Sequence, residues 1–229
     1  MSVVVQQIVY TADPVRWWAL AETLGFTAPF PPAPEWGEFH ADGVLAVHHA
    51  SAEHPAGTVD IHILVDDLDA AASALSDFAF ERGIMEGVGE LLTVRAASGI
   101  AISVSVGAAP VSERNISVQP IWFHAELTEP RRILEALGLK AGIVSDRGTW
   151  VELQADGGSV GLHAGDPRIG LSFEARGDLD EVAARLRDAG FEASVVDEAF
   201  ARTIRFAGPD GEIWINGAQD DLYGYHREV

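Results

Sequence analysis

Residues 5–8, with the sequence VQQI, and residues 24–26, LGF, both recur in the second half of the chain. They return as VQPI at residues 118–121 and LGL at residues 137–139, each 113 residues later (118 − 5 and 137 − 24) and with no gap between them. A repeat at a fixed spacing indicates duplicated structural units. The chain is therefore expected to consist of two tandem copies of one architecture.

A second block of matches follows the first, with one residue inserted between the two blocks. Its members Trp36, Glu38, Ala41, Asp42, Gly43, His49 and Ala50 align at an offset of 114 (150 − 36) with Trp150, Glu152, Ala155, Asp156, Gly157, His163 and Ala164. Each half divides again into two weakly related pieces, each about the size of one supersecondary unit. We expect an amino-terminal domain over residues 1–115, with modules 1–54 and 55–115, and a carboxy-terminal domain over residues 116–229, with modules 116–166 and 167–229. Turn-rich stretches at residues 51–57, 107–115 and 165–167 mark the boundaries.

Local patterns within the first module predict a strand, a helix and then further strands. Residues 3–11 are apolar and rich in β-branched side chains, which is typical of a buried strand. Asp13 precedes a proline and is expected to cap a helix that ends at Gly25. The runs 36–41 and 44–49 are expected to form a hairpin, because an Asp-Gly pair separates them. Helices and strands mixed in this order predict an α+β fold.

The composition excludes several classes of protein. With 229 residues, 48% of them hydrophobic and 22% charged, the chain can bury a sizeable core and is expected to be globular. No apolar stretch reaches about 18 residues and the start lacks the features of a signal peptide, so we expect a cytoplasmic protein. The formal charge of −20 argues against nucleic acid and membrane partners. Because there is no cysteine, metal ligands would have to come from His, Asp, Glu or Gln.

Several short motifs occur in a fixed order along the chain. They are Asp13-Pro14, Trp36-x-Glu38, Asp42-Gly43, Val65-Asp66-Asp67-Leu68-Asp69-Ala70-Ala71 and Gly208-Pro209-Asp210-Gly211. In order, spacing and duplication they resemble the module landmarks of the vicinal-oxygen-chelate superfamily, which includes glyoxalases, bleomycin-resistance proteins and dioxygenases. The resemblance spans nearly the whole chain. It implies an α+β fold in which four βαβββ modules pair into two curved mixed-sheet, glyoxalase-like domains that hold a small molecule.

The resemblance also implies where a ligand would be held. In metal-using members of the superfamily, the first and last strands of the modules supply His, Gln or Glu ligands to a divalent cation, whereas drug-binding members need no metal. The residues expected to bind a ligand in this chain are Gln6, His49, Asp60, His62, Ser103, Gln119 and His163. If a metal is used, Gln6, His49 and His62 are expected to hold it. The fourth module has Ile215 where a ligating glutamate is usual, so the amino-terminal cleft is expected to carry the function.

These residues leave two main functions open. The first is a small-molecule-binding protein of the glyoxalase or bleomycin-resistance type that needs no cofactor and sequesters a cationic compound, which the acidic charge favours. The alternative is a lyase, isomerase or dioxygenase that depends on a divalent metal such as zinc, nickel or iron. A module that has lost its chemistry and serves a structural or regulatory role is a third class. The expected partner is a small molecule, and the chain is expected to be a monomer or a homodimer.

Overall fold

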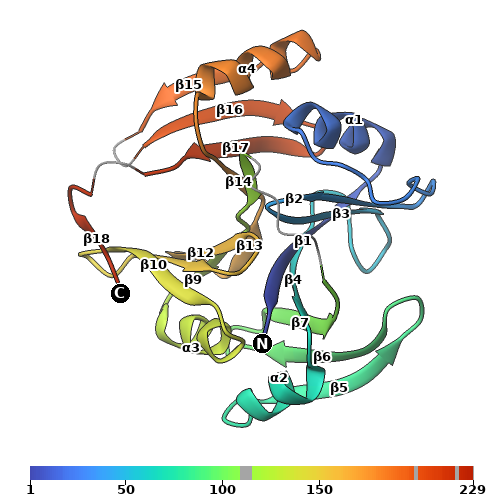
Figure 1. The fold of residues 1–229 in the computed structure, drawn as a ribbon, viewed down its shortest axis with the longest axis vertical. Coiled ribbons are helices and arrows are strands. Elements are labelled where there is room, and N and C mark those ends of the chain that lie inside the picture. The colour runs from blue at the N-terminus through green and yellow to red at the C-terminus, as the bar shows by residue number, and fades with distance from the viewer. Residues whose placement is uncertain (109–114, 199–200, 220–221, 229) are drawn as a thin grey trace.

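The computed structural model describes residues 1–108, 115–198, 201–219 and 222–228, and in these ranges the chain forms three mixed sheets with four helices (Figure 1). The first half contains β1 (Val3–Thr11), α1 (Pro14–Leu24), β2 (Trp36–Ala41), β3 (Gly43–His49), β4 (Val59–Val65), α2 (Leu68–Ala74), β5 (Phe80–Met85), β6 (Gly89–Arg95) and β7 (Ala101–Val106). The second half contains β8 (Ile116–Val118), β9 (Ile121–His124), α3 (Thr128–Ala136), β10 (Lys140–Ser145), β11 (Trp150–Gln154), β12 (Ser159–Ala164), β13 (Arg168–Gly170), β14 (Ser172–Ala175), α4 (Leu179–Asp188), β15 (Ser194–Asp197), β16 (Arg202–Gly208), β17 (Gly211–Gly217) and β18 (Tyr225–Arg227). None of the described helices is long and apolar enough to cross a membrane.

The first half of the chain forms one seven-stranded sheet in the order β2-β3-β1-β4-β7-β6-β5. Strands β1 and β4 pair antiparallel within it, with Gln6 opposite His62. They are the first strands of the first and second predicted modules, so this pairing joins the two modules into one sheet. On their outer sides, β1 pairs in parallel with β3, and β4 pairs in parallel with β7.

The second half of the chain divides its strands between two sheets. The six-stranded sheet has the order β13-β9-β12-β11-β10-β18, and the five-stranded sheet has the order β15-β16-β17-β14-β8. The first strand of the third module is interrupted at Gln119 and Pro120, so that β8 joins the smaller sheet and β9 the larger. The first strand of the fourth module is interrupted in the same way at Leu171, between β13 and β14. These interrupted strands connect the two sheets.

The local predictions for the first module are confirmed. Strands β1 and β2 have the predicted bounds, and α1 begins after Asp13, whose carboxylate accepts a hydrogen bond from the first turn of the helix at 3.2 Å. The helix ends at Gly25, which has a φ of 91°, a left-handed conformation that glycine adopts without a Cβ clash. The hairpin turns at Asp42, where Ala41 pairs with Gly43.

The first module departs from the predicted βαβββ order. Between α1 and β2 the chain makes only isolated bridges, at Thr27 and Ala33, so this module has two strands after its helix. The segment 29–34 has the sequence PFPPAP, and proline cannot donate the backbone hydrogen bond that a ladder needs. The second and third modules each have three strands after the helix, and the fourth has β15, β16 and β17 in its own sheet and then β18, which joins the six-stranded sheet.

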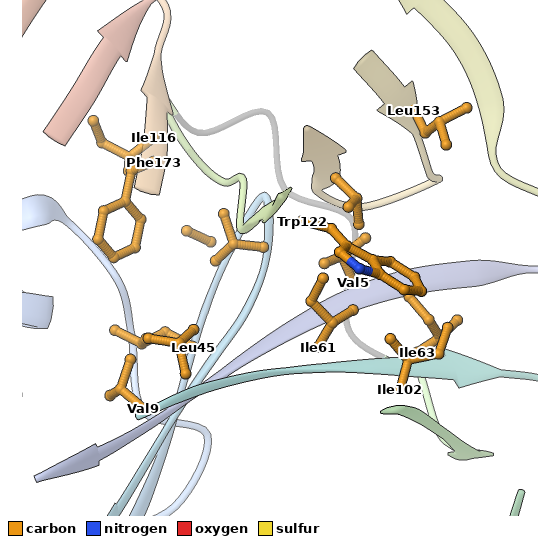
Figure 2. Packing of buried hydrophobic residues seen from close by; sticks show 14 of the residues in the cluster. Val5, Val9, Leu45, Ile61, Ile63, Ile102, Ile116, Trp122, Leu153 and Phe173 are labelled. Carbon is orange, nitrogen blue, oxygen red and sulfur yellow. The ribbon is translucent and has the colours of Figure 1, made fainter. Parts of the chain in front are cut away.

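The two halves of the chain share one hydrophobic core. Trp122 on β9 has no exposed surface, and its indole lies among Ile61, Ile63 and Ile102 of the seven-stranded sheet (Figure 2). Burying so large an aromatic side chain against the other half stabilises their association. In Figure 1, α1 of the first module also lies beside α4 of the fourth.

Hydrogen bonds from two equivalent hairpin turns also join the halves. Asp42 accepts a hydrogen bond from the Gly158 amide at 3.0 Å and another from the Ser117 hydroxyl at 2.8 Å. Asp156, in the corresponding turn of the third module, accepts one from the Val3 amide at 2.9 Å. The first and third modules therefore contact each other through the same turn, as the internal repeat suggests.

Candidate functional site

A cavity of about 560 Å³ lies between the two sheets of the carboxy-terminal half. Side chains from β9, β11, β12, β13, β14 and β17 line it, together with Tyr225 of β18, which pairs with β10 at the edge of the larger sheet. A concave space of this size with a few polar groups is typical of a small-molecule site. The candidate site therefore lies in the carboxy-terminal half, contrary to the expectation that the amino-terminal cleft carries the function.

Aromatic side chains form much of the cavity wall. Phe123, Trp150, Trp214 and Tyr225 all line it. Trp150 lies against Gly161 of the neighbouring strand, where an added Cβ would collide with the indole. The absence of a side chain at Gly161 therefore allows this indole to lie over the strand at the cavity wall.

Two of the three carboxylates that line the cavity, Glu152 and Glu174, are largely shielded from solvent, whereas Glu212 is exposed. Glu152 is only 6% exposed and accepts a hydrogen bond from the Ile143 amide at 3.1 Å. Burial first, and then the negative charge of Glu152, raises the pKa of Glu174 to about 7. Gln119 donates hydrogen bonds to Glu174 at 3.4 Å and to Ser159 at 3.1 Å. The cavity therefore holds two acidic groups whose charges repel each other, because each lies in a poorly hydrated place.

Next to this pair, Asn216 of β17 extends the polar surface. It lies opposite Glu174 in the parallel pairing of β14 with β17. Its amide nitrogen donates to the Ser172 hydroxyl at 3.2 Å, and its amide oxygen accepts from the Thr203 hydroxyl at 3.2 Å. These bonds fix the orientation of Asn216, which lines the cavity.

Strand pairing shows which residues of the two halves are equivalent. Gln6 lies opposite His62, and the register of β8 and β9 with β14 and β13 places Gln119 opposite Ser172 in the same way. His62 in turn lies opposite Ser103 in the pairing of β4 with β7, as Ser172 lies opposite Trp214 in the pairing of β14 with β17. Equivalent positions in the two halves are therefore Gln6 and Gln119, Glu38 and Glu152, His62 and Ser172, Ser103 and Trp214, Leu64 and Glu174, and Ser105 and Asn216. The two halves thus share one frame with different chemistry, since a serine replaces the histidine and a carboxylate replaces a leucine.

In the amino-terminal half, the polar groups at these positions bond to one another. His62 is within hydrogen-bond distance of the Ser103 hydroxyl at 2.6 Å and the Ser105 hydroxyl at 2.8 Å. Burial lowers the pKa of His62 to about 4, so the imidazole is neutral at pH 7. Gln6 donates to Glu38 at 3.4 Å. This half therefore has a satisfied internal network, and none of these residues lines the cavity described above.

Solved structures share this arrangement of helices and strands. The chain is similar to a catechol 2,3-dioxygenase with a TM-score of 0.66 and 15% identity, covering 100% of this chain and 96% of that one. It is similar to the 2,3-dioxygenase LapB from Pseudomonas sp. KL28 (TM-score 0.65, 13% identity, 99% and 92% covered). It is also similar to homoprotocatechuate 2,3-dioxygenase from Arthrobacter globiformis (TM-score 0.63, 13% identity, 98% and 79% covered).

The chain has the vicinal-oxygen-chelate fold. The predicted resemblance is thereby confirmed at the level of the fold, with paired modules in curved mixed sheets. No protein-family model and no curated protein matched the sequence. At these identities the similarity establishes the fold alone, so the chemistry has to be argued from the residues of this chain.

Within the vicinal-oxygen-chelate fold, the counterpart of His163 is His48 and not His49. His48 lies opposite Tyr10 in the pairing of β1 with β3, as His163 lies opposite Phe123 in the pairing of β9 with β12. The ring contacts agree, with centroids 5.6 Å apart for Tyr10 and His48 and 5.3 Å apart for Phe123 and His163. The sequence alignment at this strand is therefore shifted by one residue.

The same one-residue shift in the alignment corrects the predicted set of metal ligands, Gln6, His49 and His62. Gln6 and His62 lie opposite each other on one face of the sheet, whereas His49 is exposed and one residue out of phase with that face. An extra glycine, Gly158, lengthens the turn of the third module relative to that of the first. Because side chains alternate between faces, a shift of one residue moves a side chain across the sheet.

The remaining predicted residues have mixed outcomes. Gln119 and His163 both line the cavity. Asp60 shares a face with His62, but its carboxylate lies 3.7 Å from His54 at the surface. Ile215, predicted to occupy a ligand position, is fully buried in the core. The residues on either side of Ile215 line the cavity instead, because successive side chains of β17 point to opposite faces of the sheet.

The donor set of the cavity does not fit a divalent metal. The positions equivalent to Gln6, His62 and Ser103 hold Gln119, Ser172 and Trp214, and Gln119 directs its amide nitrogen toward Glu174 and Ser159. Among the residues that the structure describes, no group of three or more His, Asp or Glu side chains is arranged to hold a metal ion. An amide, a hydroxyl and an indole at these positions would leave the charge of a divalent cation uncompensated.

Glu152 and Glu174 are absent from the site predicted from the sequence. Glu152 could have been found, because it matches Glu38 within the repeat. Glu174 is harder to identify, because its counterpart by strand pairing is the apolar Leu64 and the offsets between the second and fourth modules drift. The available signal was that Glu174 lies two residues after Ser172, so that on a strand both side chains point to the same face.

Proposed function

We propose that this protein binds a small organic cation in its carboxy-terminal cavity without a metal. The observation that carries the proposal is the pair of carboxylates, buried Glu152 and half-buried Glu174, inside a cavity with aromatic walls. The faces of aromatic rings attract cations, and carboxylates provide the compensating charge. A protonated amine with an apolar body matches both features.

The electrostatics of the cavity favour the same class of ligand. The two carboxylates repel each other, which contributes to the raised pKa of Glu174. A cation bound between them would relieve this repulsion, whereas an anion would increase it. The net charge of −20 also raises the concentration of small cations near the surface.

Calorimetric titration of chelator-treated protein with phenethylamine and benzyltrimethylammonium tests the proposal. We expect both cations to bind, and the uncharged phenylpropanol to bind at least about tenfold more weakly, because it lacks the charge. The variants Glu174→Gln and Trp150→Ala should each weaken cation binding about tenfold or more. The controls are Trp36→Ala, at the position equivalent to Trp150, and Glu38→Gln, at the position equivalent to Glu152 in the other half, and both should bind normally. Failure of the cations to bind, or equal losses in the controls, would contradict the proposal.

The solved structures named as dioxygenases support a second candidate, a divalent-metal-dependent dioxygenase of the vicinal-oxygen-chelate superfamily. This similarity favours the metal-dependent alternative over a protein without a cofactor, whereas the donor set of the cavity favours binding alone. The test is oxygen consumption with catechol or 3,4-dihydroxyphenylacetate after addition of Fe²⁺, Mn²⁺, Ni²⁺ or Zn²⁺. Oxygen uptake that is lost in Glu174→Gln would support the dioxygenase. No uptake and no thermal stabilisation by any of these metals would exclude it.

A further inference from the structure

Arg168 provides a positive charge at the exposed side of the same cavity. It lies on β13 and lines the cavity, and its guanidinium carbon is 3.6 Å from the centre of the Phe123 ring. Its side chain makes a hydrogen bond of 3.4 Å to the backbone oxygen of Asp166. Among the described residues, no carboxylate lies within ion-pair distance of Arg168. The ring therefore holds the charge in place, and within the described part of the chain that charge has no carboxylate counterion.

Other arginines near the cavity differ from Arg168 in this respect. Arg205 forms an ion pair with Glu212 at 3.0 Å while its guanidinium lies over Trp214. Arg176 lies 3.4 Å from Asp42. Their charges are compensated within the chain, so a ligand gains little from them. Arg168 is the cavity-lining arginine whose charge remains for a ligand to use.

The positive and negative groups lie at opposite ends of one line of side chains. Arg168, Gly170, Ser172 and Glu174 occupy alternate positions along β13 and β14, and all four line the cavity. At about 3.3 Å per residue, the backbone positions of Arg168 and Glu174 are separated by up to roughly 20 Å. Gly170 between them presents no side chain, which leaves this stretch of the floor open. Because the strand is interrupted at Leu171, this separation is an upper limit, and a ligand that meets both charges carries them at its two separate ends.

From this geometry we infer that the ligand is a long zwitterion, with a protonated amine between Glu152 and Glu174 and an anionic group, such as a carboxylate, at Arg168. The inference rests on the proposed binding of a cation and adds the class of compound. The aromatic side chains between the two ends would contact the apolar body of the ligand. Guanidinium groups bind carboxylates through two parallel hydrogen bonds, which gives the exposed end its selectivity.

Calorimetry with a series of terminal amino carboxylates tests the inference. The series is aminobutanoate, aminohexanoate, aminooctanoate and aminoundecanoate, each compared with its methyl ester, which keeps the amine and removes the negative charge. For the long members we expect the carboxylate to bind about five to ten times more tightly than the ester, and for the shortest member we expect no difference. In Arg168→Gln the long carboxylates should bind only as tightly as their esters.

Two further variants make the result specific. Arg168→Lys keeps the charge but not the paired hydrogen bonds, so it should retain part of the preference. Arg185→Gln on the exposed face of α4 removes the same charge away from the cavity and should leave the preference unchanged. If the esters bind and Arg168→Gln does not alter the preference for carboxylates, the zwitterion inference is wrong and the proposed function stands. If neither the esters nor the amino carboxylates bind, the proposed function itself fails.

Discussion

Glu174 lies directly opposite Asn216 in the parallel pairing of β14 with β17, the position that Leu64 and Ser105 occupy between β4 and β7. The same backbone relationship therefore carries a carboxylate in one half and an apolar side chain in the other, where the imidazole of His62 lies two residues away on the same face. In the amino-terminal half the imidazole is neutral and bonded to two serine hydroxyls. In the carboxy-terminal half the carboxylate lines an open cavity. The duplication preserved the frame, and the substitution produced the candidate site.

Cation binding should depend on pH through Glu174. Its pKa is raised to about 7, so the group is protonated and neutral in acid and charged above that pH. We expect the affinity for organic cations to increase from about pH 6 to about pH 8, by up to about tenfold. Titration calorimetry across this range measures it. Glu174→Gln should show weak and constant affinity, whereas Glu181→Gln on α4 should keep the pH dependence of the native chain.

The same carboxylate should reduce stability at high pH. Because folding raises the pKa of Glu174 above its usual value of 4.5, the folded state favours the protonated form. Its stabilising contribution is complete below about pH 4.5 and is lost as the pH rises through about 7. Urea unfolding of Glu174→Gln should therefore give a free energy about 1–2 kcal/mol higher than that of the native chain at pH 8, allowing for its partial exposure. A variant that is less stable at pH 8 would contradict this explanation.

His62 should have the opposite effect in acid. Burial lowers its pKa from 6.5 to about 4, so the unfolded chain binds a proton more readily between these values. The free energy of unfolding should fall by about 1–3 kcal/mol as the pH is lowered from 6.5 to 4. Since Glu174 acts in the opposite direction over part of this range, the measurement is best made in the Glu174→Gln background. Adding His62→Gln, whose amide can bond both serines, should abolish the fall, and its persistence would point to another group.

The hairpin turns that join the halves should differ in importance. Asp42 accepts two hydrogen bonds from the other half and is 9% exposed, whereas Asp156 accepts one and is exposed. We expect Asp42→Ala to lower the free energy of unfolding by about 2–4 kcal/mol and Asp156→Ala by about 1 kcal/mol or less. Chemical denaturation of both variants provides the comparison. Equal losses in the free energy of unfolding would show that the number of hydrogen bonds does not determine how much each turn contributes.

Much of the fold could be predicted from local patterns and from the repeat. The strand over residues 3–11 and the helix between Asp13 and Gly25 are specified by neighbours in sequence, through β-branched residues, an acidic cap and a left-handed glycine. The prolines of residues 29–34 also indicate that the first module lacks a third strand after its helix. These features depend on a few adjacent residues, so the sequence is sufficient to predict them.

The candidate site was predicted less completely, because it depends on register. Gln119 and His163 were identified, but one extra glycine at Gly158 was enough to select His49 in place of His48. Glu174 was missed for a similar reason. On a strand, an error of one residue places every side chain on the wrong face.

The sequence by itself determined the duplicated architecture, the bounds of its first elements and the two glutamines at equivalent positions. Only the tertiary structure decided which half has the cavity, because that depends on how side chains from separate strands fill the space between sheets. Gly161 leaves room for Trp150, and Glu152 and Glu174 meet although 22 residues separate them (174 − 152). Local propensity does not record such long-range contacts, since they arise from packing between elements that are distant along the chain.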